Sequence, residues 1–173
     1  MKIRQATLDD FLGIKAVYED VLQNDIHNLT PYLEEITDGF IINELKNALT
    51  RGCAFVVEKN NEIVGYAKAY TGIFFKESHI LKNATVIFST KQQKTILSYK
   101  LLNFLFNYVM ENMPHIQYFQ TQPYSFNKDA LRLYKKFGLQ ELFETKNTIK
   151  LNNGEYANEV FLQLEFTRKD NLK

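Results

Sequence analysis

The side chains best suited to acid–base or nucleophilic chemistry are few in this sequence and stand apart from one another. The three histidines, His27, His79 and His115, are isolated, and no spacing of His, Cys or carboxylate residues is typical of a metal site. Cys53 lies in an apolar run with no histidine paired to it, so we interpret it as a small core residue and not as a nucleophile. The sequence therefore indicates neither a metal centre nor a catalytic thiol.

The distribution of charge is more informative. The net charge is only +1, from 21 Lys and Arg against 20 Asp and Glu. Residues 7–50 nevertheless hold nine acidic residues against two lysines, whereas residues 82–136 hold eight basic residues against two acidic ones. The first stretch would attract a cationic ligand and the second an anionic one.

The composition is that of one globular domain in a reducing compartment. With 173 residues, 45% of them hydrophobic, the chain can bury a core. A single cysteine forms no internal disulfide, the first residues lack the apolar stretch of a signal peptide, and no apolar run approaches the roughly 18 residues that cross a bilayer. We therefore expect a cytoplasmic protein without a membrane partner. The absence of a continuous basic and aromatic stripe argues against nucleic acid.

The elements that must position these charges follow from hydrophobic periodicity and turn signals. In chain order they are a strand over 2–6, helices over 8–23 and 31–49, strands over 53–58, 63–70 and 84–89, a long helix from 96 to the stop at Pro114, a strand over 116–122, a helix over 127–137, and strands over 142–151 and 156–166. Thr7 suits a helix N-cap, Gly138 a helix exit, and residues 152–154 a hairpin turn. No linker or repeat divides this order.

A pattern late in the chain resembles a motif of the GNAT superfamily of acyl-CoA-dependent N-acyltransferases. It comprises Asn127, Ala130, the Leu-Tyr pair that ends at Tyr134, and Gly138 followed by an apolar residue. Residues 3–10 also look like the family's first strand and turn, so the resemblance covers essentially the whole chain. It implies an α/β fold of the α+β type: a single domain over residues 1–166 and a charged tail over 167–173. Its sheet would be mixed but mostly antiparallel, with six to seven strands flanked by about four helices.

The resemblance implies acetyl-CoA as co-substrate, without a metal, bound where a loop enters the long helix. Backbone amides and the helix dipole both favour an anion at such a point. The cofactor-binding residues implied in this way are Ile87, Phe88, Gln93, Lys94, Thr95, Ile96, Leu97, Ser98 and Asn127. Ile96 and Ser98 stand where the family has small residues, and a side chain at position 96 would obstruct close approach or redirect the loop. The basic residues nearby would attract phosphates; their alternative interpretation is an ordinary solvated surface.

The resemblance also implies direct attack of a primary amine on the thioester. Tyr134 matches the family's general acid, because a phenol with an ordinary pKa of about 10 holds its proton at pH 7; the alternative is a packed helix tyrosine. A main-chain N–H near Phe88 would meet the oxyanion. Residues 78–90 contain no carboxylate, so Glu77 and His79, just before the fourth strand, are the candidates for the base. Surface roles for both, or a water chain with no dedicated base, are the alternatives.

The acceptor wall implied by the resemblance lies on the acidic first helices and includes Tyr32, Glu34 and Glu35. It suits a cationic amine on a small molecule or peptide, although a solvated helix pair would look the same. We therefore expect an N-acetyltransferase, with a homodimer allowed. One alternative is a catalytically silent module of the same fold that binds acyl-CoA or a protein partner. Ile96 and the absence of a carboxylate in the fourth strand support this alternative. Another is an interaction domain with exposed aromatics.

Overall fold

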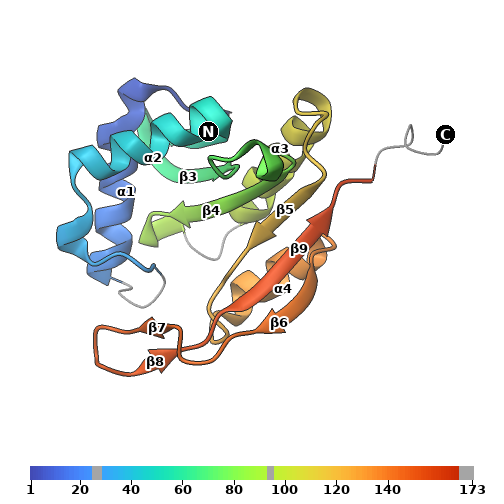
Figure 1. The fold of residues 1–173 in the computed structure, drawn as a ribbon. Coiled ribbons are helices and arrows are strands. Elements are labelled where there is room, and N and C mark those ends of the chain that lie inside the picture. Colours follow the sequence, from blue (N-terminus) through green and yellow to red (C-terminus); the bar gives the residue numbers. More distant parts are fainter. Residues whose placement is uncertain (25–28, 93–95, 168–173) are drawn as a thin grey trace.

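A sheet that divides into two halves at its middle organises the chain, as the computed structural model shows (Figure 1). The structure describes residues 1–24, 29–92 and 96–167. The strand order is β1-β2-β3-β4-β5-β9-β6, and every neighbouring pair is antiparallel except β4 and β5, which are parallel. The strands of this sheet are β1 Lys2–Gln5, β2 Gly52–Lys59, β3 Glu62–Tyr70, β4 Ile80–Phe88, β5 Tyr118–Thr121, β6 Gln140–Glu144 and β9 Val160–Glu165.

Helices cover the sheet on both faces. Helices α1 (Phe11–Asn24) and α2 (Asp38–Arg51) pack on one face of β2 to β4, and α3 (Ile96–Asn112) packs on the other. Helix α4 (Lys128–Lys136) joins the cluster on the α3 side and packs against β5, β6 and β9. None of the described helices is both long and apolar enough to cross a membrane.

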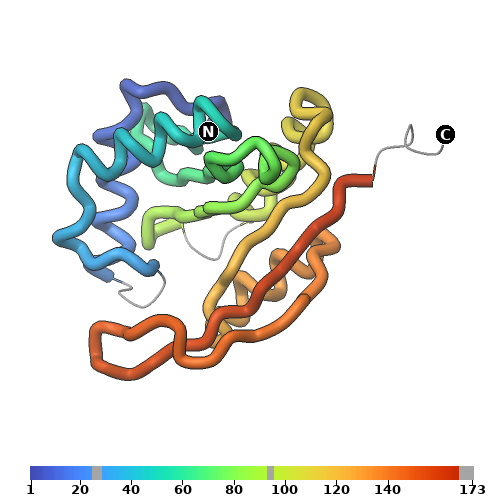
Figure 2. The backbone as a smooth tube through the Cα atoms, in the orientation of Figure 1, coloured from blue at the N-terminus to red at the C-terminus, as the bar shows by residue number. Residues whose placement is uncertain are grey.

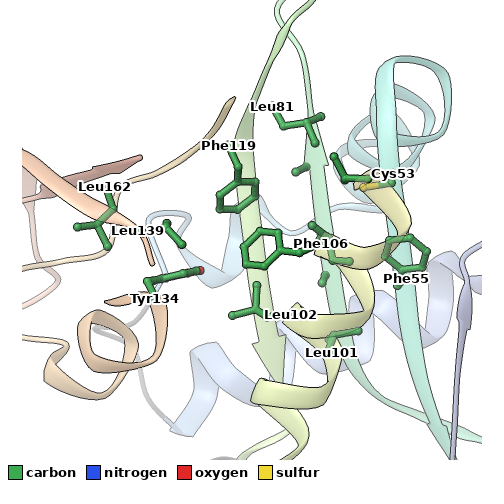
Figure 3. Packing of buried hydrophobic residues seen from close by; sticks show 14 of the residues in the cluster. Cys53, Phe55, Leu81, Leu101, Leu102, Phe106, Phe119, Tyr134, Leu139 and Leu162 are labelled. Atoms are coloured by element: carbon green, nitrogen blue, oxygen red, sulfur yellow. The ribbon is translucent and has the colours of Figure 1, made fainter. Parts of the chain in front are cut away.

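The alternation of β2 explains why the protein has two hydrophobic clusters. Cys53, Phe55 and Val57 point toward α3, whereas Ala54 and Val56 point toward α1 and α2. Figure 3 shows the α3-side cluster, in which aromatic and leucine side chains of α3, β5 and α4 meet. Cys53 is fully buried, and burial raises the pKa of its thiol to about 12. Its interpretation as a core residue is confirmed.

The expected fold class is confirmed, and some element boundaries differ from the prediction. The second helix begins seven residues after Pro31, because Thr37 caps it by accepting a hydrogen bond from the Phe40 N–H (3.1 Å). A short 3-10 turn, Leu33–Glu35, precedes it. The fourth strand begins at Ile80, four residues earlier than expected, because its start pairs with β5.

The last predicted strands are interrupted. Strand β6 ends at Glu144, where a turn with Asn147 at φ 54 begins, and the chain then forms a small separate ribbon of β7 (Ile149–Lys150) and β8 (Tyr156–Ala157). The predicted hairpin over residues 152–154 joins these two strands and is confirmed.

The two halves of the sheet separate between β4 and β5. These strands pair only at Ile80 with Tyr118 and at Leu81 with Phe119, and then diverge, as the tube in Figure 2 makes clear. Asn83 lies just past the last pair and has φ 54. Two steps along β3, from Lys68 to Tyr70, match three along β4, from Thr85 back to Lys82, so β4 carries one extra residue there. This bulge marks where the splay begins.

Candidate active site

One wall of the splay is the edge of β4 that turns toward β5. Beyond Leu81, within the described ranges, no strand pairs with this edge. Backbone N–H and C=O groups of a strand alternate between its two edges, so residues 83–88 present such groups to the splay. A ligand that itself carries amides could pair with them as an added strand would.

The side chains at the end of β4 belong to the core. Ile87 packs toward α1 and α2, while Phe88 lies on the α3 face, and both are buried. Phe88 sits over Gly65 so closely that a Cβ at position 65 would lie 2.5 Å from its Cε1. Ile87 and Phe88 can therefore serve a ligand in the splay through their backbone groups only.

The structure describes only the last part of the predicted cofactor-binding loop, residues 96–98. Gln93, Lys94 and Thr95 lie outside the described residues. Helix α3 begins at Ile96, and the N–H groups and the dipole of a helix N-terminus favour an anion. Ile96 is 67% exposed, so packing does not lock its side chain, whereas Leu97 is buried in the core. Ser98 is half-buried.

A carboxylate of α1 fixes the turn between β4 and this loop. Asp20 accepts two hydrogen bonds from Thr90, one from its N–H (2.6 Å) and one from its hydroxyl (3.1 Å). The two residues are 70 positions apart, so no local signal in the sequence pointed to this contact. This contact fixes the backbone at Thr90, between the end of β4 and the segment that leads to α3.

The opposite wall is formed by β5 and α4. Asn127 caps α4, with its Oδ1 accepting from the Ala130 N–H (3.0 Å), and Gly138 has φ 87 at the helix exit. Tyr134 is buried, and its hydroxyl hydrogen-bonds with Thr121, two residues beyond the last β5 residue that pairs with β4. Burial raises the pKa of Tyr134, so its phenol is protonated at neutral pH. In Figure 3, Tyr134 points from α4 into the cluster.

The structure does not bring the candidate bases beside Tyr134. Glu77 pairs with Lys82 (Oε1 to Nζ, 2.7 Å), and the His79 carbonyl accepts from the Gln117 N–H (2.8 Å). Both precede the paired start of β4, at the closed end of the splay. Gln117 is four residues before Thr121, which corresponds to about 13 Å along a strand. A role as base for Glu77 or His79 stays a prediction.

The predicted acceptor residues lie in the connection between α1 and α2. Glu34 and Glu35 are exposed, and Glu35 accepts from the Tyr32 N–H (2.8 Å). Just ahead of them, the Thr30 hydroxyl hydrogen-bonds with the Tyr124 hydroxyl (2.9 Å). Because Tyr124 lies between β5 and α4, this bond brings the acidic connection to the far wall of the splay.

The basic residues of α4 gather at a surface groove. Lys128, Arg132, Lys135 and Lys136 line a surface groove of about 600 Å³ together with Glu141 and Glu144 of β6. Lys135 pairs with Glu141 at 2.9 Å. That these cations attract cofactor phosphates stays a prediction. Among the described residues, no three His, Cys, Asp or Glu side chains converge as metal ligands would.

Comparison with known proteins agrees with this geometry. The family model described as "Acetyltransferase (GNAT) domain" matches residues 3–160. The chain therefore belongs to the GNAT acetyltransferase family, and the expected enzyme class, an acyl-CoA-dependent N-acetyltransferase, is confirmed. Comparison of the sequence with curated proteins gives no significant match.

Solved structures share the fold at low identity. The ribosomal-protein-alanine N-acetyltransferase of Brucella melitensis superposes with a TM-score of 0.82 at 20% identity, over 96% of this chain and 100% of that one. The yncA protein of Salmonella typhimurium, solved with its cofactor acetyl-CoA, gives 0.85 at 18%, over 97% and 95%. A phosphinothricin acetyltransferase of Sinorhizobium meliloti in complex with AcCoA gives 0.85 at 14%, over 99% and 91%.

Proposed function

We propose that this enzyme transfers the acetyl group of acetyl-CoA to a primary amine, with the thioester held in the splay between β4 and β5. The observation that carries the proposal is the unpaired edge of β4 opposite Tyr134 and Thr121. A peptide-like cofactor arm would pair with that edge, and its pyrophosphate would meet the N-terminus of α3. Acetyl-CoA complexes of two proteins with this fold support the same assignment.

The chemistry requires one bond to form and one to break. The amine nitrogen attacks the thioester carbonyl, and a main-chain N–H of β4 near Phe88 stabilises the resulting oxyanion. The carbon–sulfur bond then breaks, and the departing thiolate takes the proton of the Tyr134 phenol. The attacking nitrogen loses its extra proton as the amide forms, and this proton restores the phenol through water. A phenol is neutral at pH 7 and can act as a donor, and burial of Tyr134 raises its pKa, which keeps the proton on the phenol until the strongly basic thiolate forms.

The amine must lose a proton before it attacks, since an alkylammonium has an ordinary pKa of about 10.4. Glu77 and His79 are the sequence-based candidates for the acceptor of that proton. Their position about 13 Å along the strand from the level of Thr121 favours relay through a chain of waters. Exchange of each for Gln should lower the pH-independent rate less than loss of the acid does.

The acceptor would be a cationic amine on a small molecule or peptide. Tyr32, Glu34 and Glu35 supply an acidic lip at the mouth of the splay, which the bond between Thr30 and Tyr124 holds in place. The similar structures include proteins named ribosomal-protein-alanine N-acetyltransferase and phosphinothricin acetyltransferase, and these names support amine acceptors of different size for this fold.

Tyr134→Phe tests the proposal. General acid catalysis contributes about 10²- to 10⁴-fold to the rate. The kcat of Tyr134→Phe, measured by thiol release across a panel of amines, should therefore decrease by a factor in that range. The matched control is Tyr156→Phe, which removes an exposed phenol from β8 and should leave kcat unchanged. An unaltered kcat in Tyr134→Phe would remove Tyr134 as the acid.

A silent module that binds acetyl-CoA without turnover is the second candidate, and Ile96 at the start of α3 favours it. Calorimetry separates the two functions when it is combined with the amine panel. Binding of acetyl-CoA without thiol release for any amine would favour the silent module. Absence of binding at millimolar acetyl-CoA would overturn both.

A further inference from the structure

A buried charged group lies on the α1 and α2 face of the sheet, outside the residues used above. Lys68 of β3 is only 3% exposed, within a strand that is otherwise apolar on that face. Its ammonium contacts the Glu44 carboxylate of α2, which also accepts from the Tyr70 hydroxyl (2.9 Å). Removal of a charge from water costs free energy, so a buried lysine is stable only when its ammonium is paired. A structural or functional role for Lys68 would explain why the charge is kept there.

The second contact of Lys68 reaches the bulge in β4. Its Nζ donates a hydrogen bond to the Asn83 carbonyl at 3.0 Å. Asn83 has φ 54, a left-handed conformation that costs energy for a residue with a side chain and persists only where neighbours hold it. Lys68 is such a neighbour, since it ties the carbonyl at the bulge to α2 through Glu44.

The bulge in turn sets the direction of the unpaired edge of β4, where the acyl donor is proposed to bind. Asn83 is two residues beyond Leu81, the last β4 residue that pairs with β5. The unpaired edge over residues 83–88 therefore begins at the residue that Lys68 holds. A shift of the Asn83 peptide would rotate or translate that edge relative to Thr121 and Tyr134.

We propose that Lys68 is a positioning residue for the acyl donor: held by Glu44, it clamps the Asn83 carbonyl and so fixes the direction in which β4 leaves β5. This inference rests on the proposed function, because it assigns acetyl-CoA to the edge that the bulge orients. Lys68 does not touch the reacting atoms and acts through the backbone of β4.

The test separates positioning from stability by using two variants. Lys68→Met keeps the length of the side chain but leaves the half-buried Glu44 without its cation, which destabilises the fold. The double variant Lys68→Met/Glu44→Leu replaces the pair with apolar groups, a change that is often neutral or stabilising for a buried ion pair. Lys46→Met, on the exposed side of α2, is the matched control.

In the double variant we expect the melting temperature to return to within a few degrees of wild type, while the KM for acetyl-CoA stays at least tenfold raised and the KM for the amine is unchanged. Amide hydrogen exchange over residues 82–88 should be at least tenfold faster, and exchange in β1 and β2 should be unaltered. Lys46→Met should match wild type in all of these.

The outcomes distinguish the two proposals. A double variant with wild-type KM for acetyl-CoA and wild-type exchange over residues 82–88 would overturn the role of Lys68 and leave the proposed function standing. If the double variant does not fold, Lys68→Arg, which retains the charge, must keep slow exchange over residues 82–88, and faster exchange there would overturn the role. Failure of the wild-type protein to bind acetyl-CoA in calorimetry would overturn the proposed function, and this inference with it.

Discussion

The contact between Phe88 and Gly65 gives a direct way to disturb the β4 wall of the splay. Gly65→Ala would place a Cβ 2.5 Å from Phe88 Cε1 and 2.6 Å from Cδ1, with Val57 3.2 Å away on the other side. Carbon atoms in contact prefer about 3.5–4.0 Å, so the ring must move by about 1 Å. The ring is buried at the end of β4, and the backbone of Phe88 must follow it in part.

Overpacking of this kind costs about 1–3 kcal/mol. In a chain of this size each kcal/mol lowers the melting temperature by about 2–4 °C, so Gly65→Ala should melt about 2–12 °C below wild type in calorimetry. Because Phe88 carries part of the proposed donor edge, the affinity for acetyl-CoA should also fall. Gly65→Ala/Phe88→Leu removes the clash and should recover most of the lost stability.

Gly39→Ala is the matched control for this experiment. A Cβ at position 39 of α2 would meet only the Thr37 Oγ1, at 3.8 Å, and alanine stabilises a helix relative to glycine by about 0.5–1 kcal/mol. This variant should melt at or above wild type and bind acetyl-CoA normally. If Gly65→Ala behaves like Gly39→Ala, the packing of β4 described above is incorrect.

Three other predictions concern charge, pH and backbone conformation. Charge reversal at Glu34 and Glu35 should raise the KM for a cationic amine about tenfold and leave acetyl-CoA affinity nearly intact. An equal change in the KM for the amine and in the affinity for acetyl-CoA would show that the acidic lip has no specific role in acceptor binding. Hydrogen bonds from Arg4 hold the pKa of Asp10 below its usual range, so this carboxylate stabilises the fold at neutral pH and its contribution is lost as the pH falls below about 4. Urea unfolding at pH 7 and pH 3 should therefore show a smaller drop for Asp10→Asn than for wild type, and equal drops would contradict the assignment. Asn83→Ala should cost about 1 kcal/mol in urea unfolding whereas Asn83→Gly should cost nothing, because glycine adopts positive φ freely; equal costs would place no strain at the bulge.

Local signals predicted the C-terminal wall of the site well. The Asn127 cap, the periodic apolar positions of α4 and Gly138 at its exit all act within one helix, so the sequence alone specifies them. The hairpin over residues 152–154 was predictable for the same reason. Each of these features depends on residues that are close in the chain.

The features that shape the splay depend instead on distant residues. The start of β4 was missed because Lys82 and Asn83 interrupt its apolar alternation, and its pairing partner β5 lies more than 30 residues further along the chain. The contact of Lys68 with Glu44 joins residues 24 apart. The one available signal for it was a lysine within the apolar run of β3, which periodicity alone does not connect to α2.

Hydrogen exchange of the wild-type protein, with and without acetyl-CoA, tests whether the cofactor binds between β4 and β5. We expect slower exchange over residues 83–88 of β4 and in the first turn of α3 when acetyl-CoA is bound. We expect no change in the basic groove of about 600 Å³ between α4 and β6. Protection of residues 128–136 and 141–144, with none in β4, would place the cofactor in that groove and overturn binding between β4 and β5.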